Sequence, residues 1–477
     1  MFSLEKGERR KEKGRWRLPR VGGCRTSYAT ARRIPLRLSR LLRLPRLAVL
    51  YPFSFFLSPT TLVLLILLTT NLQAQRRDKL DRANREFTAG DYPGAIRTLQ
   101  SVKGLEGDAE GSLLLAVSRF HANDLLGAEA DLLALAEREK DDLPLVWFYL
   151  GRIYHTQHRF ARAAREYKRY LRTLGDDGAE RKTVVNLLRN VDNGVRAGYV
   201  TDQMVAENMG PRINSENDEF GPVPSPLGTG KLYFSLVRPQ LGTDQQQSDI
   251  VVSSNGAAGW GTPTSLNPYL NTAAQESLLD ISADGQKLYY FRGNGGRAGR
   301  FLVDTFRANS DQLVTLEADA PLTAGTDATP FFGAPDAVYF ASRRPGGYGG
   351  LDLYRCRRLP NGTYAPAENL GPGVNGPYDE ITPFVANDGR TLYFSTNDPR
   401  LSVGGFDVVR SYRVVGAEGQ FTQAENAGMP VNSASDDTHF RLANDTFTGF
   451  LCSDRKDGLG RRDLYVVFYV EAREEMR

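Results

Sequence analysis

Five acidic residues recur at intervals of 51 to 57 residues between positions 219 and 437, and their carboxylates could do chemistry. They are Glu219, Glu276, Asp327, Glu380 and Asp437. Two carboxylates that face each other across a pocket can hydrolyse a glycosidic bond, so a carboxylate-dependent hydrolase is one hypothesis. A ring of carboxylates that gathers a cation or a basic partner is another. Because the acid recurs once in every copy, which an active site does not need, we favour a structural role.

An asparagine precedes four of these five acids by five residues. The four are Asn214, Asn271, Asn375 and Asn432, whereas the remaining copy has Leu322 at that position. Asparagine and acidic side chains can satisfy backbone groups that lack partners in a sheet. We therefore interpret each pair as a device that joins one repeat to the next, and favour this role over ligand binding.

Other catalytic or metal-binding patterns are absent from the sequence. The four histidines, at 121, 155, 158 and 439, form no H-E-x-x-H motif, and there is no G-x-S-x-G, no phosphate-cradling loop and no cysteine pair at ligand spacing. The glycine run at 346–350 indicates a hairpin turn. Cys356 and Cys452 are expected to be buried small side chains and not a disulfide framework. We predict from these absences that the protein is not an enzyme and uses no metal or cofactor.

The elements that must position the repeated pairs are short β-strands. An aromatic residue opens a strand 12–14 residues after each acid, and a further aspartate follows 13–16 residues later. Each unit holds about four strands, which is typical of a blade in a β-propeller. Five such units predict five blades, with six as the alternative. The aromatic residues and the later aspartates are Tyr233, Tyr289, Tyr339, Tyr393 and Phe450, and Asp249, Asp304, Asp352, Asp407 and Asp463.

A repeated five-residue segment also predicts how the ring closes. Ala367–Gly371 and Ala424–Gly428 read Ala-Glu-Asn-x-Gly and join consecutive blades, and Ala206–Gly210 is a third copy with no blade before it. Its strand, around Gln203–Asn208, should therefore pair with the last strand, Asp463–Val470. Such closure removes an exposed strand edge that would otherwise aggregate.

A different repeat, with a period of 34 residues, precedes the strand units. Trp147, Leu150, Gly151, Tyr154, Ala163 and Tyr167 have the spacing of a tetratricopeptide repeat. Two earlier copies are weaker: one contains Ala95, and the other has Ala128 one position early. Apolar residues spaced as on one helix face over residues 179–198 predict an amphipathic helix that caps the stack. The fold class is thus a multidomain α + β protein, with a helical solenoid followed by an all-β propeller.

Charge is divided unequally along the chain. The total is 60 basic against 56 acidic residues, but residues 1–46 hold fifteen basic and three acidic residues, and residues 47–74 hold none. The rest has 45 basic and 53 acidic residues, which removes the basis for a nucleic-acid partner. A cationic flank, the apolar run Leu62–Leu68 and the exit Leu72-Gln-Ala74 predict a cleaved signal peptide, with an uncleaved membrane anchor as the alternative.

At these residues the chain resembles a known family. The pattern N-L-G-x2-[IV]-N … D-E-x2-P … L-Y-F-S … G-G-x-D is similar to TolB-type, WD-repeat-like propellers of bacterial envelope proteins. Helical repeats followed by this propeller resemble the front half of envelope proteins associated with type IX secretion and outer-membrane anchoring. Those relatives continue into a carboxypeptidase-regulatory-like domain and an OmpA-like domain, whereas this chain stops at Arg477. Peptidoglycan anchoring is therefore not carried over.

These observations together predict four segments and a function. The segments are a leader (1–74), a tetratricopeptide-repeat domain (75–177), a capping helix with linker (178–199) and a propeller (200–477). We expect an exported scaffold, in the periplasm or at the periplasmic face of the outer membrane. It would bind envelope proteins through the repeat groove or a propeller face, without nucleic acid. The alternatives are a propeller that binds a small ligand or glycan in its channel and, less favoured, the hydrolase.

Overall fold

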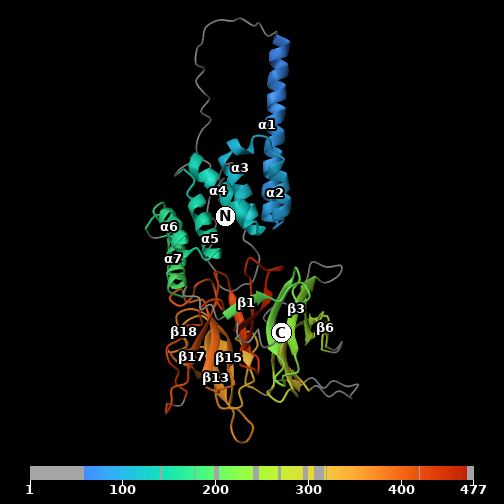
Figure 1. Ribbon diagram of the computed structural model, residues 1–477, viewed down its shortest axis with the longest axis vertical. Coiled ribbons are helices and arrows are strands. Elements are labelled where there is room, and N and C mark those ends of the chain that lie inside the picture. The colour runs from blue at the N-terminus through green and yellow to red at the C-terminus, as the bar shows by residue number, and fades with distance from the viewer. Residues whose placement is uncertain are drawn as a thin grey trace, which may run out of the picture. The chain divides into compact units, whose positions relative to one another are not determined.

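A computed structural model describes most of the chain after the leader, and Figure 1 shows its helices and strands. The described residues are 59–139, 142–176, 178–197, 204–239, 246–266, 270–293, 299–305, 316–317, 320–417 and 419–469. Residues 1–58, which hold the cationic part of the predicted leader, lie outside them. The chain forms two compact units, of which the first contains residues up to 153 and 166–185, and the second residues 154–165 and 186–477.

The N-terminal region is helical, as the sequence predicts. The α-helices are α1 (Pro59–Thr88), α2 (Tyr92–Gln100), α3 (Ala109–His121), α4 (Leu125–Glu139), α5 (Leu145–Thr156), α6 (Phe160–Leu171) and α7 (Ala179–Ala197), with the short 3-10 helix η1 at Leu105–Gly107. Helix α1 runs through the predicted cleavage position after Ala74. None of the described helices is long and apolar enough to cross a membrane.

Three of the helix-to-helix turns share one local design. Gly90, Asn123 and His158 each follow the first helix of a pair and have positive φ, at 83°, 66° and 55°. A left-handed residue at this position is a common way to end a helix. In the first two turns the next residue is an aspartate, Asp91 or Asp124, whose carboxylate accepts a hydrogen bond from a backbone N–H at the start of the second helix. The 34-residue period thus corresponds to a repeated helical hairpin.

Small residues allow the helices of a hairpin to lie close together. A Cβ added to Gly151 on α5 would lie 2.5 Å from the ring of Tyr167 on α6, and Tyr167 is fully buried. Ala95 and Ala128, on α2 and α4, are also fully buried. The predicted small positions therefore lie at close contacts. Whether these hairpins are tetratricopeptide repeats in particular stays a prediction.

The second unit includes the tip of the α5–α6 hairpin and the C-terminal half of α7. Within this unit, Asn193 of α7 donates hydrogen bonds to the carbonyl oxygens of Pro399 and Ser402, at 3.0 and 2.9 Å. A ring nitrogen of His155 lies 2.8 Å from the carbonyl oxygen of Val403. Helix α7 thus has polar partners in the loop that follows β16, which the sequence pattern did not predict.

The remainder of the second unit is a five-bladed β-propeller. Its blades contain, in order, β2 to β6, β7 to β10, β11 to β14, β15 to β18, and β19 to β21 together with β1. The bounds are β1 (Met204–Asn208), β2 (Asp218–Pro224), β3 (Lys231–Pro239), β4 (Gln246–Gly256), β5 (Gly259–Trp260), β6 (Thr264–Ser265), β7 (Gln275–Ile281), β8 (Leu288–Gly293), β9 (Gly299–Asp304), β10 (Leu316–Glu317), β11 (Asp327–Phe331), β12 (Ala337–Ser342), β13 (Asp352–Arg357), β14 (Glu368–Asn369), β15 (Glu380–Val385), β16 (Thr391–Thr396), β17 (Asp407–Tyr412), β18 (Glu425–Asn426), β19 (Asp437–Leu442), β20 (Thr448–Ser453) and β21 (Asp463–Tyr469).

The ring closes as the sequence predicts. Strand β1 pairs antiparallel with β21, with Ala206 opposite Val467. Figure 1 shows the green β1 beside the red strands of the C-terminal blade. The first strands of neighbouring blades contact each other around the whole circle, in the order β2, β7, β11, β15, β19 and back to β2. The five-bladed prediction is therefore confirmed, and β21 has a partner on each side.

The core of the propeller lies between the blades. Five clusters of buried apolar side chains each contain residues from two neighbouring blades, so that every one of the five interfaces has its own core. Phe234, Phe340 and Phe394 on the second strands are at most 1% exposed. Burial of such side chains stabilises each interface by about 2 to 3 kcal/mol per residue. These strands are buried on both faces, which explains their continuous apolar sequences.

Candidate functional site

The four predicted asparagines all lie at junctions between blades and make the same contacts. In each, the amide oxygen accepts a hydrogen bond from one backbone N–H on the third strand of the preceding blade, and the amide nitrogen donates to the carbonyl oxygen of the same residue. These distances are between 2.7 and 3.0 Å. The pairs are Asn214 with Leu464, Asn271 with Ile250, Asn375 with Leu353 and Asn432 with Val408.

The five predicted acids lie at the starts of the first strands of the five blades, and each closes its own junction loop. Every one accepts a hydrogen bond from the residue four positions before it, through that residue's backbone N–H, its hydroxyl group or both. The pairs are Glu219 with Ser215, Glu276 with Thr272, Asp327 with Thr323, Glu380 with Gly376 and Asp437 with Ser433. These contacts support the structural interpretation of the asparagine–acid pairs, which stays a prediction.

Three of the acids have an arginine partner, and two do not. Arg292, Arg344 and Arg455 form ion pairs with Glu276, Asp327 and Asp437, at 2.9, 2.8 and 2.9 Å. In the described part of the propeller, no ion pair forms with Glu219 or Glu380. The sequence analysis did not distinguish these two groups of acids, because the arginines lie on or just after the second strand and not in the asparagine–acid motif.

Burial without a cation raises the pKa of the two remaining acids. Desolvation raises the pKa of Glu219 to about 7, and the charges of Asp463 and Asp218 add to the effect. Desolvation likewise raises the pKa of Glu380 to about 7, with Asp352 and Asp398 adding to it. One carboxylate oxygen of Glu219, Oε2, has no hydrogen-bond partner among the described residues. These two carboxyl groups therefore titrate near neutral pH.

Glycines before the third strand allow close contact between adjacent blades. A Cβ added to Gly349, Gly404 or Gly460 would collide with backbone carbonyl oxygens of the next junction loop. Near these glycines, the N–H of Glu380 donates to the carbonyl oxygen of Leu351, and that of Glu219 donates to the carbonyl oxygen of Arg462. The same backbone hydrogen bond between a third strand and the next junction thus joins blade 3 to blade 4 and the last blade to the first. The glycine run at 346–350 lies between β12 and β13 of one blade, as the predicted hairpin turn requires.

The centre of the ring is crossed by one arginine side chain. Arg441 extends from β19, and its Nη2 donates a hydrogen bond to the carbonyl oxygen of Leu279 on β7, at 3.2 Å. Its guanidinium carbon lies 4.7 Å from the ring centre of Phe331 on β11 and 5.3 Å from that of Phe384 on β15. Arg441 therefore contacts the first strands of three other blades, and burial lowers its pKa from the ordinary value. The sequence analysis missed it, because no other blade repeats it.

The cysteine side chains in the propeller are buried, and the histidine there, His439, is partly buried. Desolvation lowers the pKa of His439 to about 3, so the ring is neutral at physiological pH. Cys356 and Cys452 are free and fully buried, as predicted, and burial raises the pKa of each thiol to about 11. Over the residues that the structure describes, no group of three or more His, Cys, Asp or Glu side chains could hold a metal ion.

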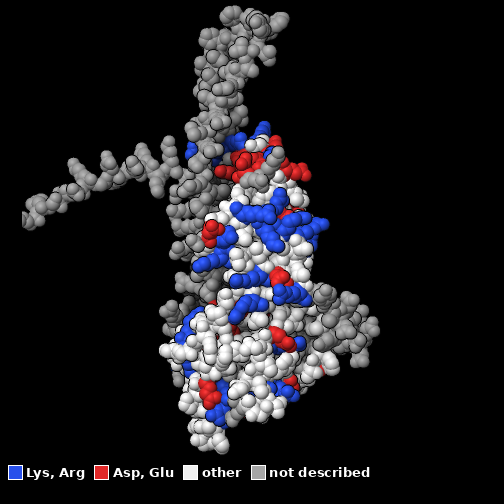
Figure 2. Space-filling view, turned by 90° about the vertical axis from the view of Figure 1, so that its left-hand side faces the viewer, with Lys and Arg blue, Asp and Glu red and all other residues white. Residues whose placement is uncertain are grey.

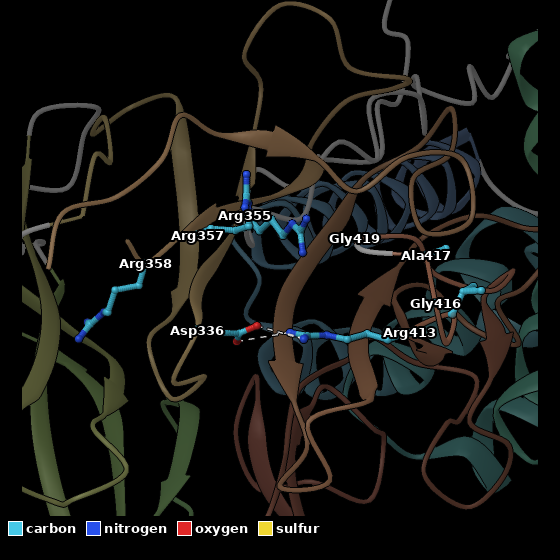
Figure 3. A pocket seen from close by; sticks show the side chains of 9 residues that line it. Asp336, Arg355, Arg357, Arg358, Arg413, Gly416, Ala417 and Gly419 are labelled. Carbon is cyan, nitrogen blue, oxygen red and sulfur yellow. Dashed lines mark hydrogen bonds and ion pairs between the residues drawn. The ribbon is translucent and has the colours of Figure 1, made fainter. Parts of the chain in front are cut away.

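A cavity of about 550 Å³ lies between blades 3 and 4, at the end of the strands opposite the junction loops, and arginines line it. Its lining includes Arg355, Arg357 and Arg358 at the end of β13, and Arg413 just after β17. Figure 3 shows Arg413 directed at Asp336, whereas Arg358 points away from both. The sequence analysis missed this cavity, since its residues come from segments with no shared motif, and the ion-paired Asp336 and Arg413 lie 77 positions apart.

Charged side chains form no continuous basic surface on the propeller face that Figure 2 shows, where blue and red groups are scattered among uncharged residues. This agrees with the acidic balance of the chain after the leader, which holds 45 basic and 53 acidic residues.

Comparison with known proteins finds similarity to solved structures at low sequence identity. No protein-family model matches the chain, and no curated protein is similar to it in sequence. The solved structures that it resembles include TolB from Acinetobacter baumannii, at 14% identity and a TM-score of 0.31, over 62% of this chain and 72% of that one. They also include the endo-arabinase from Bacteroides thetaiotaomicron, at 13% identity and a TM-score of 0.36, over 55% of this chain and 95% of that one.

One of the predictions from the sequence needs correction. We predicted that the protein is not an enzyme, and the comparison contradicts this. Propellers that it resembles include a protein named as a glycoside hydrolase, at 9% identity and a TM-score of 0.40, over 57% of this chain and 94% of that one. The prediction relied on missing motifs, and missing motifs do not exclude catalysis. The five sheets and the closed ring of strand contacts show that the C-terminal region is a β-propeller, and TolB and glycoside hydrolase structures are among those it is similar to at low identity.

Proposed function

We propose that this protein is exported and works in the cell envelope by binding a protein partner, with the helical hairpins and the propeller as its two binding modules. The cationic leader, the apolar run and the exit at Ala74 support export. We also propose, from the spacing of Trp147, Leu150, Gly151 and Tyr154 and from the resemblance to envelope proteins in which helical repeats precede a TolB-type propeller, that the hairpins are tetratricopeptide repeats. The same resemblance supports a place at the outer membrane or beside secretion machinery.

The observation that carries this proposal is that the repeated polar residues make their contacts within the protein. The asparagines and the acids make their hydrogen bonds inside the blade junctions, and the glycines before the third strands allow close backbone contact there. The residues that recur therefore hold the repeats together, and the loops between them are left to vary. Repeat architectures built in this way commonly bind macromolecules over an extended surface.

The alternative of a ligand in the propeller channel has less support. Arg441 crosses the channel and contacts Leu279, Phe331 and Phe384 on three other blades. A small ligand or glycan at that level would have to displace a side chain that already has a hydrogen bond and two aromatic neighbours. The channel is therefore not the binding site that we propose.

Crosslinking in cells tests the proposal. A tagged protein would be crosslinked in growing cells, purified from the envelope fraction and examined by mass spectrometry, with an unrelated exported protein carrying the same tag as the control. We expect one protein partner in nearly equimolar amount, with crosslinks to the helical hairpins or to propeller loops. Purification without any stoichiometric partner would contradict the proposal.

A further inference from the structure

The arginine-lined cavity between blades 3 and 4 contains a buried donor without an acceptor. Arg413 donates from Nη1 to Asp336 Oδ2 at 3.0 Å and from Nη2 to Asp336 Oδ1 at 3.4 Å, and Nη2 also donates to the hydroxyl of Tyr339. Its third nitrogen, Nε, is buried and has no hydrogen-bond partner among the described residues. A buried N–H without an acceptor is unfavourable. The protein's own groups therefore leave the guanidinium group of Arg413 incompletely satisfied.

Two other guanidinium groups in the cavity already bind a carboxylate of the protein. Arg355 and Arg357 each donate two hydrogen bonds to Glu368 on β14, at 3.0 to 3.3 Å. The side chain of Arg355 is only 8% exposed. Gly419 lies against it, and a Cβ at Gly419 would collide with its guanidinium group. The wall of the cavity thus holds the planar guanidinium group of Arg355 close to the backbone. A guanidinium group held in this way can donate two parallel hydrogen bonds to the paired oxygen atoms of a carboxylate or phosphate.

The charge of the cavity is positive. Among the described residues, four arginines line or border it, against the carboxylates of Asp336 and Glu368. Two positive charges remain in excess in that set. Glu418, in the same loop as Gly419, lies outside the described residues. A volume of about 550 Å³ falls within the range of small-ligand sites in proteins.

We propose that this cavity binds a phosphate group, either as free phosphate or as a phosphate monoester. Such a group carries about 1.5 to 2 negative charges at pH 7 and has three strong acceptor oxygens. It matches the excess charge better than a single carboxylate does, and its oxygens can accept from the guanidinium groups of Arg413 and of a second arginine that lines the cavity. The site goes beyond the proposed protein partner and does not depend on it.

Calorimetric titration of the purified protein tests the site. The probes are inorganic phosphate, glycerol 3-phosphate and, as a carboxylate, citrate. Vesicles of phosphatidylcholine with and without phosphatidic acid test a lipid headgroup as the source of the phosphate. We expect saturable binding of at least one phosphate probe, and weaker or no binding of citrate. Citrate that binds as tightly as the best phosphate probe would overturn the assignment of phosphate.

Three variants locate the binding. Arg413→Gln should weaken phosphate binding at least tenfold, because it removes the charge and the forked donors. The matched control is Arg461→Gln, an exposed arginine in the loop between β20 and β21, which should bind within twofold of the parent. Asp336→Asn removes the carboxylate that competes for Arg413, so it should tighten binding at least threefold. A loss of folding cannot produce such a gain.

The outcomes separate clearly. Arg413-dependent binding of glycerol 3-phosphate in solution supports the site with a soluble ligand. Arg413-dependent binding to phosphatidic acid vesicles alone supports it with a lipid headgroup. Arg413-dependent binding of inorganic phosphate alone supports it with free phosphate. If no phosphate probe binds in a way that depends on Arg413, or if Asp336→Asn weakens binding, the proposal is wrong. Because none of these titrations contains a protein partner, their failure leaves the proposed function to its own test.

Discussion

The guanidinium group of Arg441 on β19 donates a hydrogen bond to the carbonyl oxygen of Leu279 on β7, although a whole blade lies between these two strands in the ring. The contact spans the channel and brings the cation near Asp280, whose carboxylate accepts hydrogen bonds from the backbone N–H groups of Phe332 and Gly333. Burial raises the pKa of Asp280, and the charge of Arg441 opposes that rise. The centre of the propeller is therefore a polar link between blades.

Replacement of this arginine should destabilise the ring. Arg441→Ala removes the hydrogen bond to Leu279 and the contacts with two aromatic rings, so we expect a loss of about 1 to 3 kcal/mol in the free energy of unfolding. Urea unfolding at pH 7 measures it. Arg461→Ala, at an exposed position, should change the stability by less than about 0.5 kcal/mol. Equal stabilities of the two variants would show that the central contact contributes nothing.

Glu380 should make the stability of the protein depend on pH. Its pKa is raised from 4.5 to about 7 in the folded protein. The stabilisation that comes from its protonated form is fully present below about pH 4.5 and is lost as the pH rises through about 7. Glu380→Gln stays neutral, so between pH 5 and pH 8 the parent should lose up to about 3 kcal/mol relative to this variant, at about 1.4 kcal/mol per pKa unit.

Urea unfolding of both proteins at pH 5, 6, 7 and 8 measures this difference. Glu216→Gln is the matched control, because Glu216 is exposed, and its difference from the parent should not change over the same range. If the difference between the parent and Glu380→Gln is also constant, Glu380 ionises normally in the folded state.

The junction asparagines should not tolerate aspartate. Asn432 both accepts from the N–H of Val408 and donates to its carbonyl oxygen, each at 2.7 Å. Asn432→Asp keeps the acceptor but loses the donor and places a carboxylate against a carbonyl oxygen. We expect a loss of about 1 to 3 kcal/mol.

Asn361 is the matched control for this substitution. In its exposed turn, its side-chain oxygen accepts from the backbone N–H and the hydroxyl of Thr363, and an aspartate can do the same. Asn361→Asp should therefore melt at nearly the same temperature as the parent. If Asn432→Asp melts there too, the junction bonds are not structural.

The N-terminal strand should be needed to keep the propeller monomeric. Deletion of residues 201–208 removes β1 and leaves β21 as an exposed edge, which favours pairing between molecules. Size-exclusion chromatography with light scattering should show oligomers or aggregates. A monomer of unchanged stability would mean that closure by β1 is not important.

The fold could largely be predicted from sequence because its repeats carry their own signals. The third copy of Ala-Glu-Asn-x-Gly at Ala206–Gly210 had no blade before it, and this alone predicted the pairing of β1 with β21. The asparagine–acid spacing likewise placed the junctions. These signals work because the same backbone geometry recurs, and it needs the same side chains each time.

Features that occur once could not be predicted in this way. Arg441 has no counterpart in other blades, so no comparison between repeats could mark it. Asp336 and Arg413 are brought together only because blades 3 and 4 are neighbours in the ring. The raised pKa values of Glu219 and Glu380 come from burial without an arginine ion pair, and the arginines that form such pairs in the other blades lie outside the motif.

The most direct test of the proposed function is the mass of the protein in fractionated cells, because binding an envelope partner requires export. Intact-mass measurement with N-terminal sequencing should find a mature chain that begins near Gln75, in the periplasmic or outer-membrane fraction. A chain that keeps residues 1–74 and remains in the cytosolic fraction would contradict the account.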